Sequence, residues 1–263
     1  MALFDTHAHL TDERFDGDRA EVLRRLLAAG VDRVVTVGDA SSGDAWAARA
    51  LAEQHECLYF AAGVHPHDAS KHGPEAERAI RGLLAHPKAV ALGEVGLDFH
   101  YDLSPRDAQR QAFEAQLDLA LALGRPVILH IREAHGEAID RLLARSRAGR
   151  LPRGVMHCFS GSWESAKRYL DMGMYISLSG SATFKNAPKL QEVARNVPAD
   201  RLLVETDCPY LAPEPMRGRR NEPAFVAHTA ARVARLRGED AEEFAARARQ
   251  NGMRLFDMRE DAQ

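Results

Sequence analysis

Histidine and carboxylate residues gather in short strings, and each string follows a run of apolar residues. The strings are Asp5-Thr6-His7-Ala8-His9, Gly63-Val64-His65-Pro66-His67, Gly93-Glu94-Val95-Gly96-Leu97-Asp98, His157-Cys158-Phe159-Ser160-Gly161 and Glu205-Thr206-Asp207-Cys208-Pro209, with His130 at the end of a further run. Imidazole and carboxylate ligands together suit Zn, Mn, Fe or Co, and also Mg where more oxygens take part. Bound ions of this kind activate water, so these residue types predict metal-dependent hydrolysis.

The spacing of His7 and His9 has a direct physical meaning. Side chains two residues apart on a strand point the same way, so both rings can reach one metal ion. Glu205 and Asp207 have the same spacing on the last predicted strand, which is next to the first in a closed barrel. One such histidine taken alone is more often a core or surface residue. Six candidate ligands at five strand ends together predict a metal site.

Eight short runs of β character must position these strings, with helical stretches between them. The runs are residues 3–6, 32–37, 58–62, 89–93, 127–129, 154–156, 175–178 and 202–205. Most are apolar throughout rather than alternating, which is typical of parallel strands covered on both faces. Among the helices, Ser104-Pro105 predicts an N-cap followed by a proline at the first helical position.

Strand followed by helix, eight times, predicts one (β/α)8 TIM-type barrel over residues 1–263. An open, doubly wound sheet would have a similar periodicity. The barrel is favoured because the polar strings all follow the carboxyl ends of strands. In a barrel these ends converge on one face, where barrel enzymes carry their active sites.

Composition narrows the class of protein further. The 35 basic and 38 acidic residues leave a formal net charge of −3, which excludes a uniformly basic nucleic-acid coat. Three cysteines without a CxxC pair favour a reducing compartment. No secretory leader and no apolar run of about 18 residues is apparent, so we expect a cytoplasmic protein without a membrane span. No glycine-rich phosphate or dinucleotide fingerprint is present, so no nucleotide cofactor is expected.

These strings, together with Tyr210-Leu211-Ala212-Pro213, Arg219-Arg220-Asn221-Glu222-Pro223 and Asn251-Gly252-Met253-Arg254-Leu255-Phe256, resemble the TatD-type metal-dependent deoxyribonucleases of the amidohydrolase superfamily. The resemblance implies a centre of two divalent ions, Mg, Mn or Zn. By this resemblance one ion is held by His7, His9 and Asp207, the other by His130 and His157, and Glu94 bridges them. Glu205 would lie in or next to this shell.

The resemblance also implies a 3′-to-5′ exonuclease that acts on DNA. RNA stays open as an alternative substrate, and we expect the protein to be a monomer. Asp207, a ligand with a second oxygen, is the first candidate to accept a proton from the attacking water, and Glu205 is the second. Arginine forks match phosphate oxygens, so Arg219 and Arg220 in the loop after the last strand are candidate substrate contacts. His65 is a further candidate for contact with the substrate.

Four residues beside the ligands have structural interpretations. Packing under the site is expected for Phe159 and Tyr210, although either ring could stack on a base. Cys158 and Cys208 alternate with ligand positions, so we expect both to point away from the site.

Two other functions stay open on the sequence. The same ligands could serve an ester or amide hydrolase, for example one that deacylates aminoacyl-tRNA, or a metal- or nucleic-acid-binding protein without activity. A phosphate substrate should depend on Arg219 or Arg220, whereas an uncharged ester should not.

Overall fold

The computed structural model describes residues 2–259 and contains one parallel sheet of eight strands, which follow the order of the chain. The strands are β1 Leu3–Ala8, β2 Val31–Asp39, β3 Leu58–Gly63, β4 Ala89–Asp98, β5 Val127–Arg132, β6 Gly154–Met156, β7 Tyr175–Leu178 and β8 Leu202–Val204. All eight predicted strands are therefore present, and each overlaps its predicted range.

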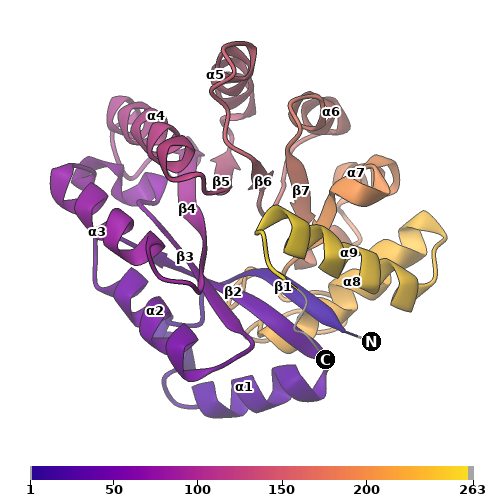
Figure 1. Ribbon diagram of the computed structural model, residues 1–263. Coiled ribbons are helices and arrows are strands. Elements are labelled where there is room, and N and C mark those ends of the chain that lie inside the picture. Colours follow the sequence, from indigo (N-terminus) through magenta and orange to yellow (C-terminus); the bar gives the residue numbers. More distant parts are fainter. Residues whose placement is uncertain (1, 260–263) are drawn as a thin grey trace.

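Helices surround the strands on the outside, as Figure 1 shows. They are α1 Arg19–Ala28, α2 Asp44–Gln54, α3 Pro74–Leu84, α4 Arg106–Leu123, α5 His135–Arg147, α6 Trp163–Asp171, α7 Pro188–Asn196, α8 Val226–Arg237 and α9 Ala241–Leu255. None of these described helices is long and apolar enough to cross a membrane.

Contacts between the first and last strands complete the barrel. Ala8 and Cys208 form a parallel bridge, and the Thr6 hydroxyl donates to the Val204 carbonyl oxygen at 3.1 Å. The buried Asp5 carboxylate also accepts the backbone N–H of Thr206 at 2.8 Å. The predicted (β/α)8 barrel is confirmed by this closure, which an open doubly wound sheet would lack.

The sheet separates two clusters of buried apolar side chains. The larger cluster lies between the strands and the surrounding helices. The smaller one takes at least one side chain from every strand, and α9 contributes Met253 and Leu255 with the following Phe256. Phe4 and Phe256 lie with ring centroids 6.0 Å apart. Helix α9 thus closes the amino-terminal end of the barrel and leaves the carboxyl end for the site.

Several predicted boundaries differ from those of the structure, and two of the differences have a clear physical reason. Strand β4 continues to Asp98 because Gly93 and Gly96 allow close approach to β5 and do not end the strand; a Cβ at Gly96 would lie 1.8 Å from the His130 carbonyl oxygen. Helix α4 begins at Arg106, so Pro105 is its N-cap. The Ser104 hydroxyl makes no cap bond and donates to the His67 carbonyl oxygen at 2.7 Å.

Candidate metal centre

The predicted ligands meet at the carboxyl end of the barrel, where all except the fully buried His7 line a cavity of about 800 Å³. We call this set the Glu94 cluster. Its members come from the carboxyl-terminal halves of β1, β4 and β5 and from the segments directly after β1, β6 and β8: His7, His9, Glu94, His130, His157 and Asp207. Because neighbouring strands fix both the position and the direction of each side chain, the cluster is set by the barrel itself.

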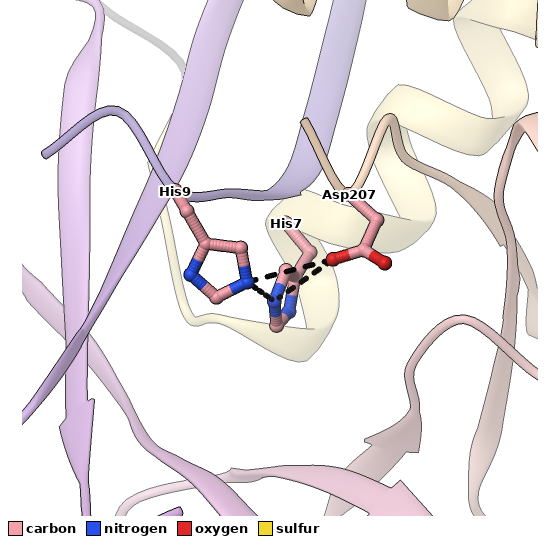
Figure 2. A group of neighbouring side chains, drawn as sticks. All are labelled: His7, His9 and Asp207. Carbon is pink, nitrogen blue, oxygen red and sulfur yellow. Dashed lines mark hydrogen bonds and ion pairs between the residues drawn. The ribbon is translucent and has the colours of Figure 1, made fainter. Parts of the chain in front are cut away.

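Three members form one side of the Glu94 cluster, and Figure 2 shows how they face one another. The Nε2 atoms of His7 and His9 are 3.2 Å apart. Asp207 Oδ1 lies 3.8 Å from His7 Nε2 and 3.5 Å from His9 Nε2. Asp207 has φ 56°, in the left-handed region that aspartate tolerates better than most residues. This backbone turn after β8 directs its carboxylate toward the two rings.

The other side of the cluster holds His130 and His157. His130 Nδ1 lies 2.6 Å from Glu94 Oε1, and His157 Nε2 lies 2.7 Å from the same oxygen. The two ring nitrogens are 3.3 Å apart. These three residues thus offer a second set of converging donor atoms.

Glu94 lies between the two sets and presents a different oxygen to each. Its Oε2 faces His7 Nε2 at 3.3 Å and His9 Nε2 at 3.8 Å, while Oε1 faces His130 and His157. Glu94 is 5% exposed. A carboxylate with one oxygen toward each set of imidazoles has the arrangement of a bridging ligand.

Distances within the cluster fit shared divalent ions. Ligand nitrogens and oxygens lie about 2.0–2.2 Å from zinc, so two ligands of one ion should be about 3–3.8 Å apart. The separations between His7, His9 and Asp207 fall in this range, as does that between His130 and His157. Glu94 Oε2 is also at such distances from His7 and His9, whereas Glu94 Oε1 lies at hydrogen-bond distances of 2.6 and 2.7 Å from His130 and His157. The donor set fits a metal centre, and its spacing fits best on the side of His7, His9 and Asp207.

The charged groups of the Glu94 cluster shift one another's pKa values. Burial alone would raise the pKa of Glu94, but His157, His65 and His7 outweigh it and hold that pKa well below its usual value. Burial opposes charge on His157 as well, yet Glu94 and Glu205 hold the pKa of His157 well above its ordinary value. For His7, burial dominates and lowers the pKa. Opposite charges in a buried space stabilise one another strongly, which is the environment that a cation would enter.

Glu205 lies behind the ligands. Its side chain is fully buried, and its Oε1 accepts the backbone N–H of Cys158 at 2.6 Å and lies 3.3 Å from His157 Nδ1. Oε2 is buried with no hydrogen-bond partner among the described residues. A carboxylate on Nδ1 leaves Nε2 of the same ring for a metal, so Glu205 is placed to orient His157.

Asp98 has the same relation to His130, and the sequence analysis gave it no role. Its Oδ2 lies 3.1 Å from His130 Nε2 and 2.9 Å from His67 Nε2. The side-chain amide of Gln109 holds the Asp98 backbone: its Oε1 accepts the Asp98 N–H at 2.8 Å, and its Nε2 donates to the Asp98 carbonyl oxygen at 3.1 Å. Arg132 also lines the cavity and was missed. Both follow a ligand at an even spacing on its own strand, and this spacing could have identified them.

His65 reaches the cavity beside Glu94. Its Nε2 lies 3.4 Å from Glu94 Oε1, so it could be counted as a ligand with Glu94 and His130. However, the backbone N–H of His67 donates to His65 Nδ1 at 3.1 Å. The neutral ring then carries its proton on Nε2, which makes it a hydrogen-bond donor toward the cavity. Burial lowers the pKa of His65 to about 4, which favours this neutral form.

The two predicted arginine contacts do not line the cavity. Arg220 donates to both oxygens of Asp18 at 2.7 Å and lies 4.6 Å above the ring of Phe15. Arg219 is exposed. The structure thus directs Arg220 to α1's amino-terminal end and away from the Glu94 cluster.

Of the four side chains next to the ligands, two lie as predicted and two do not. Phe159 and Cys208 are buried, as predicted. Cys158 lines the cavity, with Sγ 3.2 Å from Ser179 Oγ, so its predicted orientation was wrong. Its positive φ of 42° breaks the strand alternation on which that prediction relied. Tyr210 is 47% exposed on the cavity rim and does not pack under the site.

A parallel eight-stranded barrel with imidazoles and carboxylates converging at the carboxyl ends of its strands defines a metal-dependent hydrolase. Comparison with known proteins agrees. The model of the family described as "TatD related DNase" matches residues 4–257, so the chain belongs to this family.

Relatives match along nearly their whole length. The uncharacterized metal-dependent hydrolase YabD of Bacillus subtilis (strain 168) is 43% identical, over 97% of this chain and 98% of the relative. The 3′-5′ ssDNA/RNA exonuclease TatD of Citrobacter koseri is 40% identical, over 97% and 98%. The crystal structure of the TatD homolog YJJV from Escherichia coli K12 is 33% identical, covers 98% of both chains and has a TM-score of 0.89.

Proposed function

We propose that this protein is a 3′-to-5′ exonuclease that removes nucleotides from single-stranded DNA or RNA. Relatives that carry this activity in their names are 40% identical over almost the whole chain. The observation that carries the proposal is the position of Glu94, with one carboxylate oxygen toward each of two sets of ligand atoms. Centres of two ions are a recurrent solution for cleaving phosphodiesters.

The four histidines divide between two ions by the oxygen of Glu94 that they face, and Asp207 joins the pair to which it lies close, His7 and His9. His7, His9 and Asp207 would hold one, and His130 and His157 the other, with Glu94 shared. When bound, such ions lower the pKa of a water molecule and polarise the phosphoryl oxygens. The ligand chemistry accommodates Mg, Mn or Zn.

Protons are moved and held by groups of the chain itself. Asp207 directs Oδ1 at His7 and His9, and its second oxygen points away from both rings (Figure 2). We assign this second oxygen as the acceptor of the proton from the attacking water. Glu205 is buried behind His157, so it acts by orienting that ring. The Nε2–H of His65 donates to a non-bridging phosphoryl oxygen.

The reaction balances with water as the only co-substrate. A bond forms between the water oxygen and phosphorus while the bond between phosphorus and the 3′ oxygen of the preceding nucleotide breaks. That 3′ oxygen receives a proton and becomes a hydroxyl group. The released nucleotide keeps the 5′ phosphate.

Hydrolysis of a single-stranded oligonucleotide tests the proposal. Protein stripped of metal is supplied with Mg, Mn or Zn and incubated with the oligonucleotide labelled at its 5′ end. We expect stepwise shortening from the 3′ end that requires the ion. His7→Ala should remove it, because His7 is buried in the centre and contacts both Glu94 and Asp207.

The same preparations are offered an aminoacyl ester of an oligonucleotide. Release of the amino acid without shortening, from protein that binds two equivalents of metal, would replace the nuclease by an esterase. Binding of metal with neither reaction would leave a protein without this hydrolytic activity.

We also propose a cytoplasmic location, which three free cysteines support. The monomeric state stays a prediction that sedimentation of the purified protein would test.

A further inference from the structure

Exposed apolar side chains are concentrated at the mouth of the metal centre. The described part of the chain has seven large hydrophobic side chains that are exposed. Four of them line the one cavity that holds the Glu94 cluster: Tyr101, Leu103, Tyr210 and Leu211. The other three, Leu27, Trp46 and Leu121, do not line it. Scattered exposed residues need no explanation, whereas a group around one cavity indicates a surface for a ligand.

The two tyrosines lie on opposite sides of the centre. Tyr101 follows β4 and Tyr210 follows β8, and these strands are four positions apart in a barrel of eight. Tyr210 meets the ring of His9 edge-on, with centroids 6.0 Å apart. Tyr101 meets His67 edge-on at 5.5 Å.

These contacts place one tyrosine at each side of Glu94. His9 belongs to the set that faces Oε2. His67 shares Asp98 with His130, which faces Oε1. A chain that crosses the cavity over Glu94 would therefore meet one tyrosine before the centre and the other after it.

Each tyrosine carries an arginine over its ring. The guanidinium carbon of Arg14 lies 4.3 Å from the centroid of Tyr210, and Asp12 holds this guanidinium through two bonds, at 2.8 and 2.7 Å. That of Arg132, itself on the cavity wall, lies 4.7 Å from the centroid of Tyr101. About half of each tyrosine remains exposed: 47% of Tyr210 and 54% of Tyr101.

An aromatic ring paired with a guanidinium suits a nucleotide. Any base can stack on the ring, and the guanidinium packs against the same ring and helps to hold it in position. Only an unpaired base can leave its own stack to do so. Two such pairs on either side of a hydrolytic centre fit two successive unpaired nucleotides.

We propose that Tyr101 and Tyr210 are stacking platforms for the two nucleosides joined by the scissile phosphate, one for the nucleotide released and the other for the nucleotide that remains. This inference rests on the proposed nuclease function and defines its substrate as a strand unpaired on both sides of the bond that is cut. Arg132 and Arg14 support the two platforms.

A cycle of protein variants and abasic substrates tests the inference. Tyr101→Ala and Tyr210→Ala are compared with Tyr101→Phe and Tyr210→Phe, which keep the ring. Substrates are single-stranded oligonucleotides with a tetrahydrofuran abasic residue at the 3′-terminal position, at the penultimate position, or at neither. Trp46→Ala is the matched control, because Trp46 is also exposed and lies near an arginine, Arg49 at 5.8 Å, but is not part of the cavity lining.

On the normal oligonucleotide each alanine variant should lower kcat/KM about ten- to a hundredfold, while the phenylalanine variants and Trp46→Ala stay within about threefold of the wild type. An abasic residue at one position should abolish the effect of one tyrosine, and an abasic residue at the other position that of the other. Two distinct couplings would support two platforms.

Equal losses on normal and abasic substrates would overturn the inference and leave the nuclease function intact, since the tyrosines would then only shape the cavity. Metal-dependent hydrolysis of methyl p-nitrophenyl phosphate, without cleavage of any oligonucleotide by the wild type, would overturn both the inference and the nuclease function.

Discussion

The Glu94 cluster and the Arg217–Arg220 loop lie at the same end of the barrel, and both are rich in charged side chains. Members of the cluster face one another across the cavity, and all are at least partly buried. The loop arginines bind their nearest neighbours: Arg217 lies 3.8 Å above the ring of Phe184, and Arg220 pairs with Asp18. Short side chains on strand ends have few directions available, whereas a long arginine on a loop reaches the nearest carboxylate or ring.

This difference separates two uses of charge. In the cluster, opposite charges are buried together and stabilise one another, as the pKa shifts of Glu94 and His157 show. In the loop, the charges lie nearer the surface, and Arg220 is paired with Asp18. The Arg220 guanidinium, for example, holds the pKa of Asp18 at about 2. We therefore assign a catalytic role to the Glu94 cluster and a structural role to the arginine loop.

The largest effect is expected for Glu94→Gln. A neutral amide cannot serve two cations with two anionic oxygens, so we expect kcat/KM to fall about a thousandfold or more. Metal content, measured on the purified protein by atomic emission, should fall below that of the wild type. Glu53→Gln is the control, since this exposed glutamate on α2 pairs with Arg49. Activity within tenfold of the wild type would refute the bridging role.

Much of this site could be predicted from the sequence because it depends on backbone topology. A strand end fixes the direction of a side chain to within the pleat, so apolar runs followed by histidine or carboxylate were enough to bring His7, Glu94 and His130 together. The partners of the ligands were harder to predict. Asp98 could have been identified by its even spacing from Glu94, but only once β4 was known to extend beyond Gly93.

Loop residues could not be placed in this way. The direction of Arg220 depends on Asp18, which is about 200 residues distant in the chain and is brought near by barrel closure. Cys158 and Asp207 adopt positive φ values that no strand pattern predicts. Sequence patterns therefore predicted which strands carry the site. They failed where a loop residue contacts a residue that is distant in the sequence.

A second, smaller effect concerns the carboxylates behind the ligands. Asp98→Asn and Glu205→Gln should each weaken metal binding about ten- to a hundredfold, because the rings of His130 and His157 lose the anionic partners that orient them. Titration of the stripped protein with Mn or Zn measures the affinity. Asp68→Asn is the control: Asp68 also lines the cavity but pairs with Lys71. Unchanged affinity in both variants would show that the cluster is positioned without them.

A third prediction compares two histidines whose pKa values move in opposite directions. The pKa of His157 is raised by its carboxylate partners, whereas burial lowers the pKa of His135 to about 4. His135 Nδ1 lies 3.0 Å from the Tyr169 hydroxyl, and its Nε2 is buried without a hydrogen-bond partner among the described residues. The unfolded chain, with a histidine pKa near 6.5, then binds a proton that the folded chain excludes.

Stability should therefore fall as pH falls from about 6.5 toward 4, and stay constant above that window so far as His135 is concerned. A difference of about 2.5 pKa units corresponds to at most about 3 kcal/mol by pH 4. Urea unfolding of the wild type and His135→Asn at pH 7.5 and pH 5 measures this contribution. Between pH 7.5 and pH 5 the wild type should lose more of its free energy of unfolding than His135→Asn does. Equal losses would mean that His135 accepts a proton in the folded state.

The smallest effect is expected in the arginine loop. Arg220→Ala should leave kcat/KM on an oligonucleotide within about threefold, because its guanidinium is bound to Asp18 and lies over Phe15, outside the cavity lining. Loss of the stacking on Phe15 should lower Tm by about 1–4 °C. Arg219→Ala, at an exposed position on the same loop, is the matched control and should change neither quantity. A large rise in KM for Arg220→Ala, with Tm unchanged, would instead show that the loop leaves Asp18 to bind phosphate, and would remove the distinction between cluster and loop.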